Sequence, residues 1–228
     1  GMVARLNDLV HRVSGVRTTT ALAGPGELAN FYDVWIASTS SETLADTLKQ
    51  ARDNKKELWA YNCQWNGTQP ANDRYYCGYH MWVTGLRGNW QWCYTEGLSG
   101  SSRLTDEVKW DNPYYEEPWY VNYVLPTPEG NLPTLGWEAR REGIDDYRYL
   151  QTLRAAIDAA PLGKRSVAAA AERFLTEAGH RMQAPQQLLN ATNTGRNYGF
   201  VMDPGLGVQD YDDLRAQAAD YIIKLQGP

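Results

Sequence analysis

The first ninety residues alternate between hydrophobic patterns typical of helices and of strands. Apolar side chains at positions 6, 9, 10 and 13 fall on one face of a helix. Short runs rich in β-branched and aromatic residues, bounded by Gly, Asn and Pro, then predict strands. These runs cover 16–22, 31–37, a segment that begins at Leu58, and 89–94. Ser41 can cap a helix that leads into the third run.

The stretch 57–94 predicts a strand, a helix and a second strand. Pro70 suits the first turn of the helix. Tyr75, Tyr79 and Trp82 then recur on one helical face, and two glycines shortly afterwards end the helix. A strand–helix–strand unit requires a parallel pair of strands in a covered sheet. The sequence therefore predicts an α/β fold.

A segment rich in prolines and aromatic rings, 95–134, follows the fourth predicted strand. Within it, the alternation from Trp119 to Leu125 predicts an additional strand, and 127–130 reads as a turn. A loop of this length inside a domain is usually functional or an insertion. Because it follows a strand, it can fold over the same end of the sheet; a structural hairpin is the alternative.

Thr134 begins the strongest predicted helix, which it can cap. Its apolar stripe consists of Ala139, Ile144, Tyr147, Leu150, Leu153 and Ile157. The acidic and basic residues between these positions are typical of a solvated helix face. Gly143 in mid-helix costs about 1 kcal/mol relative to Ala. We therefore expect another element to pack closely against it.

Pro161 ends this helix, and two further helices are predicted over 166–178 and 211–225. We interpret them as an extension of the same domain. The predicted organisation is accordingly a first part, 1–160, that carries the long aromatic loop at 95–134, and a C-terminal helical extension, 161–228.

Aromatic residues give the first indication of function. The chain has nine Trp and fifteen Tyr but only three Phe, a choice typical of rings that must be both packed and wet. Several of them follow predicted strands together with amides and a carboxylate, where α/β folds bind ligands. Rings and polar groups gathered at the ends of strands suit a polar ligand with flat apolar faces, of which a sugar is the obvious case. The alternative is a Trp-rich core.

Charge, cysteine content and hydropathy exclude several other classes. A net charge of −5 without a basic stripe argues against a nucleic-acid partner. No apolar run reaches membrane length and no signal peptide is visible, so we expect no membrane partner. Gly1 before Met2 is typical of an expression remnant, and a natural chain that began upstream would leave the compartment unknown.

Cysteines and histidines predict neither a metal site nor a cofactor. Cys63, Cys77 and Cys93 lack the spacing of zinc ligands or of a disulfide framework, so structural thiols are expected. The histidines at 11, 80 and 180 lie far apart in the sequence, which argues against a metal centre or a histidine-based triad.

Two stretches resemble a known family. The phrase WEARREGIDDYRYLQTL, from Trp137 to Leu153, resembles the C-terminal signature of the DUF4091 proteins, catalytic-domain relatives of glycoside hydrolase family 123. The stretch 57–94 resembles the same family's segment across the seventh and eighth barrel strands. The matching positions are Tyr61, Asn62, Arg74, Tyr75, Gly78, Trp82, Gly85, Gly88 and Trp92. The resemblance covers residues 16 to 155.

The resemblance implies a (β/α)8 TIM-type barrel that acts on β-linked N-acetylhexosamines. Only about four βα units are predicted here, matching the fifth to the eighth of the family. The expected fold is therefore a partial barrel, its C-terminal half, followed by extra C-terminal helices. Such a half-barrel exposes two sheet edges, which we expect self-association, a missing N-terminal half-barrel or the chain's own later segments to cover.

Two departures from the family affect the functional prediction. Gly136 stands where the family usually has an Arg before the Trp-Glu of the helix signature. The family also carries an adjacent Asp-Glu pair at the end of its fourth strand. The acidic pairs 106–107, 116–117 and 145–146 of this chain do not follow predicted strands, so none suits the general-acid role.

Three functions follow as hypotheses. The chain is a fragment of a β-N-acetylhexosaminidase-type glycoside hydrolase that is inactive alone, a non-catalytic carbohydrate-binding or structural module, or an enzyme that pairs Glu96 with Glu116 or Glu117. Under the first two hypotheses, amide and phenol groups would hydrogen-bond to the sugar. Aromatic rings would line its pocket, and a carboxylate would bind its hydroxyl groups. The predicted substrate-binding residues are Trp35, Tyr61, Asn62, Trp92, Tyr94, Glu96 and Glu138.

Overall fold

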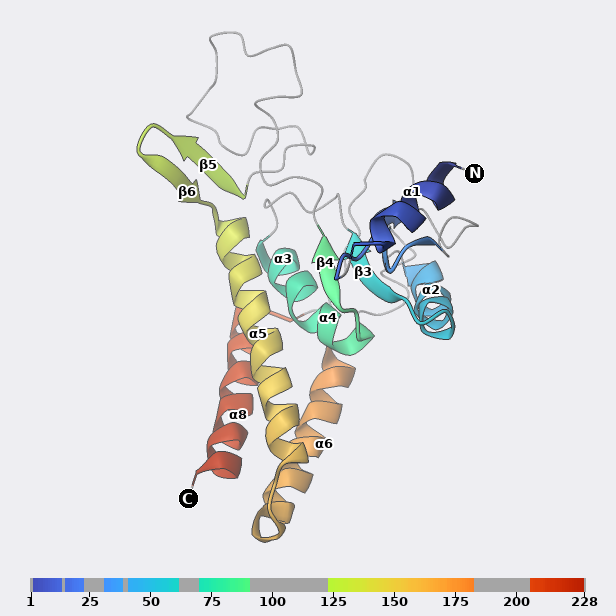
Figure 1. The fold of residues 1–228 in the computed structure, drawn as a ribbon. Helices are drawn as coiled ribbons and strands as arrows, with labels where there is room; N and C mark the ends of the chain where they lie inside the picture. Colours follow the sequence, from blue (N-terminus) through green and yellow to red (C-terminus); the bar gives the residue numbers. More distant parts are fainter. Residues whose placement is uncertain are drawn as a thin grey trace. The chain divides into compact units, whose positions relative to one another are not determined.

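The computed structural model shows a mixed α/β protein in two compact units, each described by itself (Figure 1). It describes residues 2–13, 15–22, 31–38, 41–61, 70–90, 123–182 and 206–227. The first unit holds helices α1 and α2 and a four-stranded sheet. The second holds α3, α4, a two-stranded hairpin and three long helices. None of the helices in these ranges is long and apolar enough to cross a membrane.

The sheet of the first unit is parallel throughout and runs in the order β1-β2-β3-β4. Its strands are β1 (Thr19–Leu22), β2 (Val34–Ser38), β3 (Glu57–Tyr61) and β4 (Gly88–Trp90). Helix α2 (Ser41–Asp53) connects β2 to β3. The prediction of an α/β fold with four parallel strands is thus confirmed.

The interior of this sheet is apolar on both faces of β2. Val34, Trp35 and Ile36 are all buried, although successive side chains of a strand point to opposite faces. Leu58 and Ala60 of β3 are buried as well. A strand buried on both sides is what a covered parallel sheet requires.

Helix α1 (Met2–His11) is held to the sheet through its last residue. His11 Nε2 lies 2.8 Å from Asp33 Oδ2, and the same oxygen accepts a hydrogen bond from Thr18 N at 2.7 Å. Burial opposes ionisation of Asp33, but these bonds outweigh it and lower its pKa to about 2. The hydrogen bond to Asp33 in turn raises the pKa of His11. This ion pair connects the C-terminal end of α1 to Asp33, the residue that directly precedes β2.

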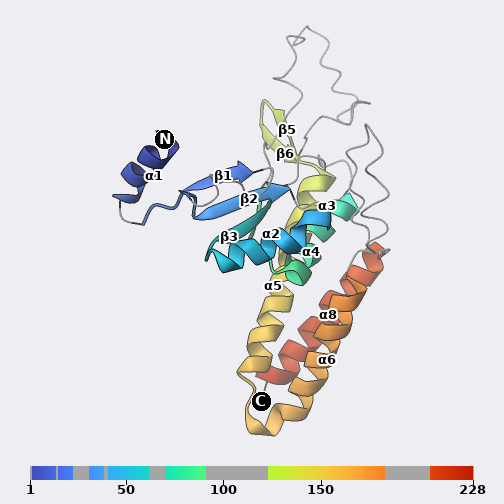
Figure 2. The same ribbon diagram turned by 90° about the vertical axis from the view of Figure 1, so that its right-hand side faces the viewer.

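Three long helices of the second unit lie side by side (Figure 2). They are α5 (Leu135–Asp158), α6 (Arg165–Arg181) and α8 (Val208–Gln226), and the short 3-10 turn η2 (Leu162–Lys164) joins the first two. All three were predicted. Helix α5 packs against α6 and α8 within one unit.

A hairpin precedes α5. Its strands β5 (Val124–Thr127) and β6 (Gly130–Pro133) are antiparallel, which confirms the predicted turn at 127–130. The predicted strand 119–125 overlaps β5 only at its end, and 119–122 lie outside the described residues. Thr134 caps α5 as predicted, since its Oγ1 accepts from Trp137 N at 3.4 Å.

The helix predicted across 70–84 is broken in two at Gly78. The pieces are α3 (Pro70–Cys77) and α4 (Tyr79–Thr84), and Gly85 follows with φ +71°. A Cβ on Gly143 would lie 2.3 Å from the Arg74 carbonyl oxygen, and one on Gly78 would lie 2.5 Å from that of Gly143. The two backbones therefore touch, which confirms that an element packs against Gly143.

Candidate functional site

An aromatic pair joins two adjacent strands, with Trp90 at the carboxyl end of β4 and Trp59 in the middle of β3. Trp90, the last residue of β4, is 44% exposed, and its ring centroid lies 6.4 Å from that of Trp59 at an angle of 31°. Trp90 pairs in register with Tyr61, the last residue of β3. The parallel register thus brings two aromatic positions side by side at the end of the sheet where α/β folds bind ligands.

Gly88 makes room for this pair. It pairs in register with Trp59, and a Cβ at Gly88 would lie 2.4 Å from the indole ring of Trp59. The ring consequently lies across the backbone of β4. Trp59 Nε1 is enclosed and has no hydrogen-bond acceptor among the residues that the structure describes. An indole N–H can only donate, and because this nitrogen is enclosed it does not face a ligand at the surface of the sheet.

Trp35 does not share this end of the sheet. It is the second residue of β2, is 2% exposed, and pairs in register with Leu58, three positions before Tyr61. It therefore belongs to the core, and the predicted role as a pocket wall finds no support in its position. Tyr61, in contrast, ends β3 as the sequence predicted.

The other predicted site residues are divided between the second unit and undescribed parts of the chain. Glu138 lies in the first turn of α5, where its carboxylate accepts from Arg141 Nε at 2.7 Å. The remaining four lie outside the described residues, as do the acidic pairs of the long loop. These four are Asn62, Trp92, Tyr94 and Glu96.

Trp59 and Trp90 are not among the site residues predicted from the sequence. A signal for Trp90 was available, because Trp90 and Trp92 are two apart in a predicted strand and so occupy the same face. For Trp59 the signal was weaker. Its neighbour Gly88 is twenty-nine positions away, and only the register of β3 and β4 shows that they meet.

The second unit contains a buried carboxyl group at the start of α3. Asp73 is 0% exposed, and its Oδ1 accepts from the Tyr123 hydroxyl at 3.2 Å and lies 3.4 Å from Arg140 Nε. The Arg140 guanidinium in turn lies over the Tyr123 ring, 4.4 Å from its centroid. These contacts join α3, α5 and the residue that precedes the hairpin.

Burial raises the pKa of Asp73 to about 7, although Arg140 and the Tyr123 hydroxyl both act to lower it. Its second oxygen, Oδ2, has no hydrogen-bond partner in the described parts of the chain, which favours the neutral acid. Burial likewise raises the pKa of the neighbouring Cys77 thiol to about 11. An acid with a pKa near 7 is suited to proton transfer, but Asp73 is enclosed.

Replacing Asp73 by Asn should remove a pH dependence of stability. A carboxyl whose pKa is raised in the folded state favours folding while it is protonated, so its contribution is lost as pH rises from about 4 to about 7. Relative to the Asn variant, the wild type should lose on the order of 1 kcal/mol of unfolding free energy per pH unit in this range. Urea unfolding between pH 4 and 8 measures the difference. Equal slopes would show that Asp73 ionises normally.

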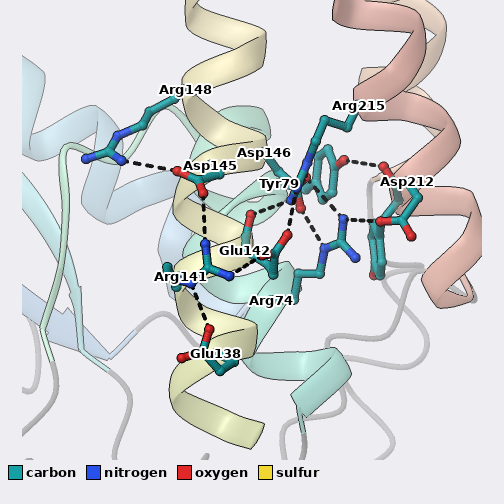
Figure 3. A network of polar contacts seen from close by, with 11 residues as sticks. Arg74, Tyr79, Glu138, Arg141, Glu142, Asp145, Asp146, Arg148, Asp212 and Arg215 are labelled. Atoms are coloured by element: carbon teal, nitrogen blue, oxygen red, sulfur yellow. Dashed lines mark hydrogen bonds and ion pairs between the residues drawn. The ribbon is translucent and has the colours of Figure 1, made fainter. Parts of the chain in front are cut away.

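An ionic cluster joins α3, α5 and α8 (Figure 3). Asp146, whose side chain is 0% exposed, accepts from Arg74 Nε at 2.8 Å and from Arg215 Nε at 2.6 Å. Arg74 also donates to Asp212 at 2.8 Å, and Arg215 to Glu142 at 2.6 Å. The prediction that the charged residues of α5 form a solvated face is therefore wrong for Asp146.

The same prediction is confirmed for the outer charges of α5. Arg141 pairs with Glu138, Glu142 and Asp145, and Arg148 pairs with Asp145 at 3.1 Å. These side chains are between 30% and 72% exposed. Exposed pairs of this kind typically contribute at most about 1 kcal/mol each.

His80 is a core residue. It is 4% exposed, its ring stacks on Tyr76 with centroids 5.3 Å apart, and burial lowers its pKa to about 4. It is consequently neutral at physiological pH. Within the described ranges, no three His, Cys, Asp or Glu side chains gather as metal ligands would.

Comparisons with known proteins give no family. A scan against models of protein families finds none that matches this chain, and a search of curated proteins finds no match. The resemblance to DUF4091 proteins stays a prediction from the sequence.

Proposed function

We propose that this chain is the carbohydrate-binding part of a glycoside hydrolase-like barrel of the β-N-acetylhexosaminidase type and is inactive alone. The observation that carries the proposal is the exposed ring of Trp90, which ends β4 and lies beside Trp59 of the adjacent parallel strand. Three further features support the proposal. They are the order of the strands, the chemistry of the aromatic rings and the positions of the acidic residues.

The strand order favours a barrel wall. In doubly wound α/β sheets the order reverses at a switch point, whereas in a (β/α)8 barrel each strand pairs with the next along the chain. The order β1-β2-β3-β4 is of the second kind and contains no reversal. Four strands amount to half of an eight-stranded barrel, in agreement with the resemblance to the last four units of DUF4091 proteins.

The aromatic pair suits a pyranose ring. One face of such a sugar presents C–H groups that pack on an indole, while its hydroxyl and acetamido groups need polar partners. Trp90 supplies an exposed ring, and the Trp59 ring packs beside it. Trp90 ends β4, where barrels bind their substrates.

The described strands do not supply catalytic acids. Their single acidic residue is Glu57, which opens β3 at the end opposite Trp90. Glycoside hydrolysis normally needs two carboxyl groups about 5–9 Å apart across the bond that breaks. Binding without turnover is therefore the expected behaviour. A non-catalytic binding or structural module is the alternative that shares this expectation.

Trp90→Ala is expected to weaken binding of N-acetylglucosamine at least about tenfold, because stacking on one ring contributes on the order of 1 kcal/mol beyond the area that it buries. Trp137→Ala is the matched control, since Trp137 is 37% exposed but lies on α5 in the other unit. Isothermal titration with the monosaccharide and its short β-linked oligomers measures both affinities.

Equal losses in the two variants would place the sugar elsewhere, and no binding by the wild type would leave only a structural role. Hydrolysis of an aryl N-acetyl-β-hexosaminide decides the question of catalysis. We expect no turnover by this chain. Turnover that Glu96→Gln abolishes would instead favour an enzyme that uses acids of the long loop.

A further inference from the structure

Both nitrogens of the His11 ring face groups that accept hydrogen bonds. Nδ1 lies 3.0 Å from the Asn7 carbonyl oxygen in the last turn of α1, and Nε2 lies 2.8 Å from Asp33 Oδ2. A carbonyl oxygen can only accept, and so can an ionised carboxylate. A neutral imidazole has one N–H and can donate to one of these oxygens, whereas the imidazolium donates to both. The contacts therefore fit the protonated ring.

Asp33 is the ionised acceptor in this arrangement. Its Oδ2 accepts from Thr18 N at 2.7 Å and from Thr18 Oγ1 at 3.1 Å, besides its contact with the His11 ring. Burial opposes ionisation, but these bonds outweigh it and lower the pKa of Asp33 to about 2. The carboxylate consequently stays charged throughout the pH range in which a histidine titrates.

The charges around His11 favour its protonated form. The hydrogen bond to Asp33 does most to raise the pKa of His11, and the charge of Asp33 and the bond to the Asn7 carbonyl add to it. Desolvation and the positive charge of Lys56, which directly precedes β3, act in the opposite direction without cancelling the increase. A cation at the C-terminal end of a helix is also stabilised by the helix dipole. The pKa of His11 thus lies above the ordinary histidine value of about 6.5.

The apolar side chains of α1 contribute little to its attachment. Leu6, Leu9 and Val13 are 53%, 54% and 58% exposed. Among the α1 side chains that the structure describes, His11 is the one that hydrogen-bonds to another element. Gly15, with φ +80°, then provides a joint of wide backbone freedom between α1 and β1. The state of the His11 ring therefore has a large influence on where this helix lies.

We propose that His11 is a pH-sensitive switch, which holds the C-terminal end of α1 at Asp33 while its ring is protonated and releases the helix when the ring loses a proton. Loss of the Nε2 proton leaves a lone pair facing a carboxylate, and loss of the Nδ1 proton leaves one facing a carbonyl. In both cases a hydrogen bond becomes a contact between two acceptors.

The direction of the pH dependence follows from linkage. A histidine whose pKa is raised in the docked state stabilises docking fully below its ordinary pKa. This stabilisation is lost as the pH rises through the raised pKa of His11. The docking equilibrium constant should fall tenfold for each pH unit by which docked His11 titrates above the same residue in the unfolded chain.

An NMR titration of the histidine ring signals measures the first of these quantities. His11→Ala assigns the His11 signal among the three histidines of the chain. We expect its midpoint in the native protein to lie above its midpoint in urea, and the nitrogen shifts at pH 6 to be those of an imidazolium. Asp33→Asn, which keeps an oxygen for Thr18 but removes the charge, should lower the native midpoint. A native midpoint at or below that of the unfolded chain would overturn the inference.

Amide hydrogen exchange of residues 2–11 measures release of the helix between pH 5 and 9, with each rate divided by the intrinsic rate at that pH. An isolated helix of ten residues is marginal in water, so an undocked α1 should lose protection. Protection in the wild type should fall through the His11 midpoint, by the factor that linkage requires. His11→Arg, which stays charged, should remain protected at pH 9, and His11→Ala should be unprotected at every pH.

His180→Ala is the matched control, because His180 also lies at the end of a helix but belongs to the other unit. Its α1 amides should follow the wild-type profile. Wild-type protection that does not change between pH 5 and 9 would overturn the inference. Protection of α1 that is retained in His11→Ala would do the same, since the helix would then be held by other contacts.

Discussion

Asp146→Ala is expected to destabilise the second unit by about 3–5 kcal/mol. The carboxylate of Asp146 is 0% exposed and is paired to both Arg74 and Arg215. Its removal would leave the Arg74 guanidinium, 8% exposed, with Asp212 as its remaining ion-pair partner in the described chain. Losing one member of a buried ion pair costs more than the pair itself contributes, because the other charge stays desolvated. Urea unfolding followed by circular dichroism of the helices measures the change.

The neighbouring residue provides the control. Asp145 bears the same side chain on the same helix, but it is 31% exposed and pairs with Arg141 and Arg148 at the surface. Asp145→Ala should lower the free energy of unfolding by no more than about 1 kcal/mol. Similar losses in the two variants would show that the cluster around Asp146 is not a buried unit.

Gly143→Ala is expected to destabilise the second unit by about 3 kcal/mol, although Ala is the better helix former. The added Cβ would lie 2.3 Å from the Arg74 carbonyl oxygen and 3.1 Å from Gly78 N. Both atoms belong to backbone, which cannot rotate away as a side chain can. The helices α3 and α5 would have to separate, which would also lengthen the bond from Arg74 to Asp146.

A glycine of α6 serves as the matched control for this prediction. Gly179 also lies inside a helix, but a Cβ there would meet nothing within 4 Å. Gly179→Ala should therefore raise the free energy of unfolding by about 0.5–1 kcal/mol. Thermal unfolding of the two variants should move in opposite directions. A stabilising Gly143→Ala would mean that the two helix backbones do not touch.

Local elements were predictable because their signals are local. Periodicity located the strands and long helices, and the turn at 127–130 and the cap at Thr134 follow from residue types alone. The break at Gly78 was not predicted, since it depends on the approach of Gly143, sixty-five positions later. Gly143 itself indicated a close contact but not its partner.

Burial along α5 shows where sequence patterns fail. The predicted stripe included Ile144, which is 44% exposed, whereas Gly143 and Asp146 occupy the buried face instead. A charged residue within a run of acidic and basic residues on a helix is normally assigned to the solvent-exposed face. Asp146 is buried because Arg74 and Arg215 approach it from two other helices, and no local pattern reveals that.

The residues predicted for the site differ from the aromatic pair of β3 and β4. The sequence indicated that aromatic residues follow β3 and β4, and Tyr61 does end β3. It also selected Trp35, which the register places within the core. The contact of Trp59 with Trp90 emerges only once β3 and β4 are paired, since Gly88 determines where the ring of Trp59 lies.

The most direct test of the proposed function is an NMR titration of the tryptophan indole N–H signals with N-acetylglucosamine. Trp59→Phe and Trp90→Phe assign two of the nine expected signals. We predict that these two shift with the sugar and saturate at a common affinity, while the signal of Trp137 stays in place. If the signals of Trp59 and Trp90 do not move while the sugar is in excess, the aromatic pair is not a sugar-binding site.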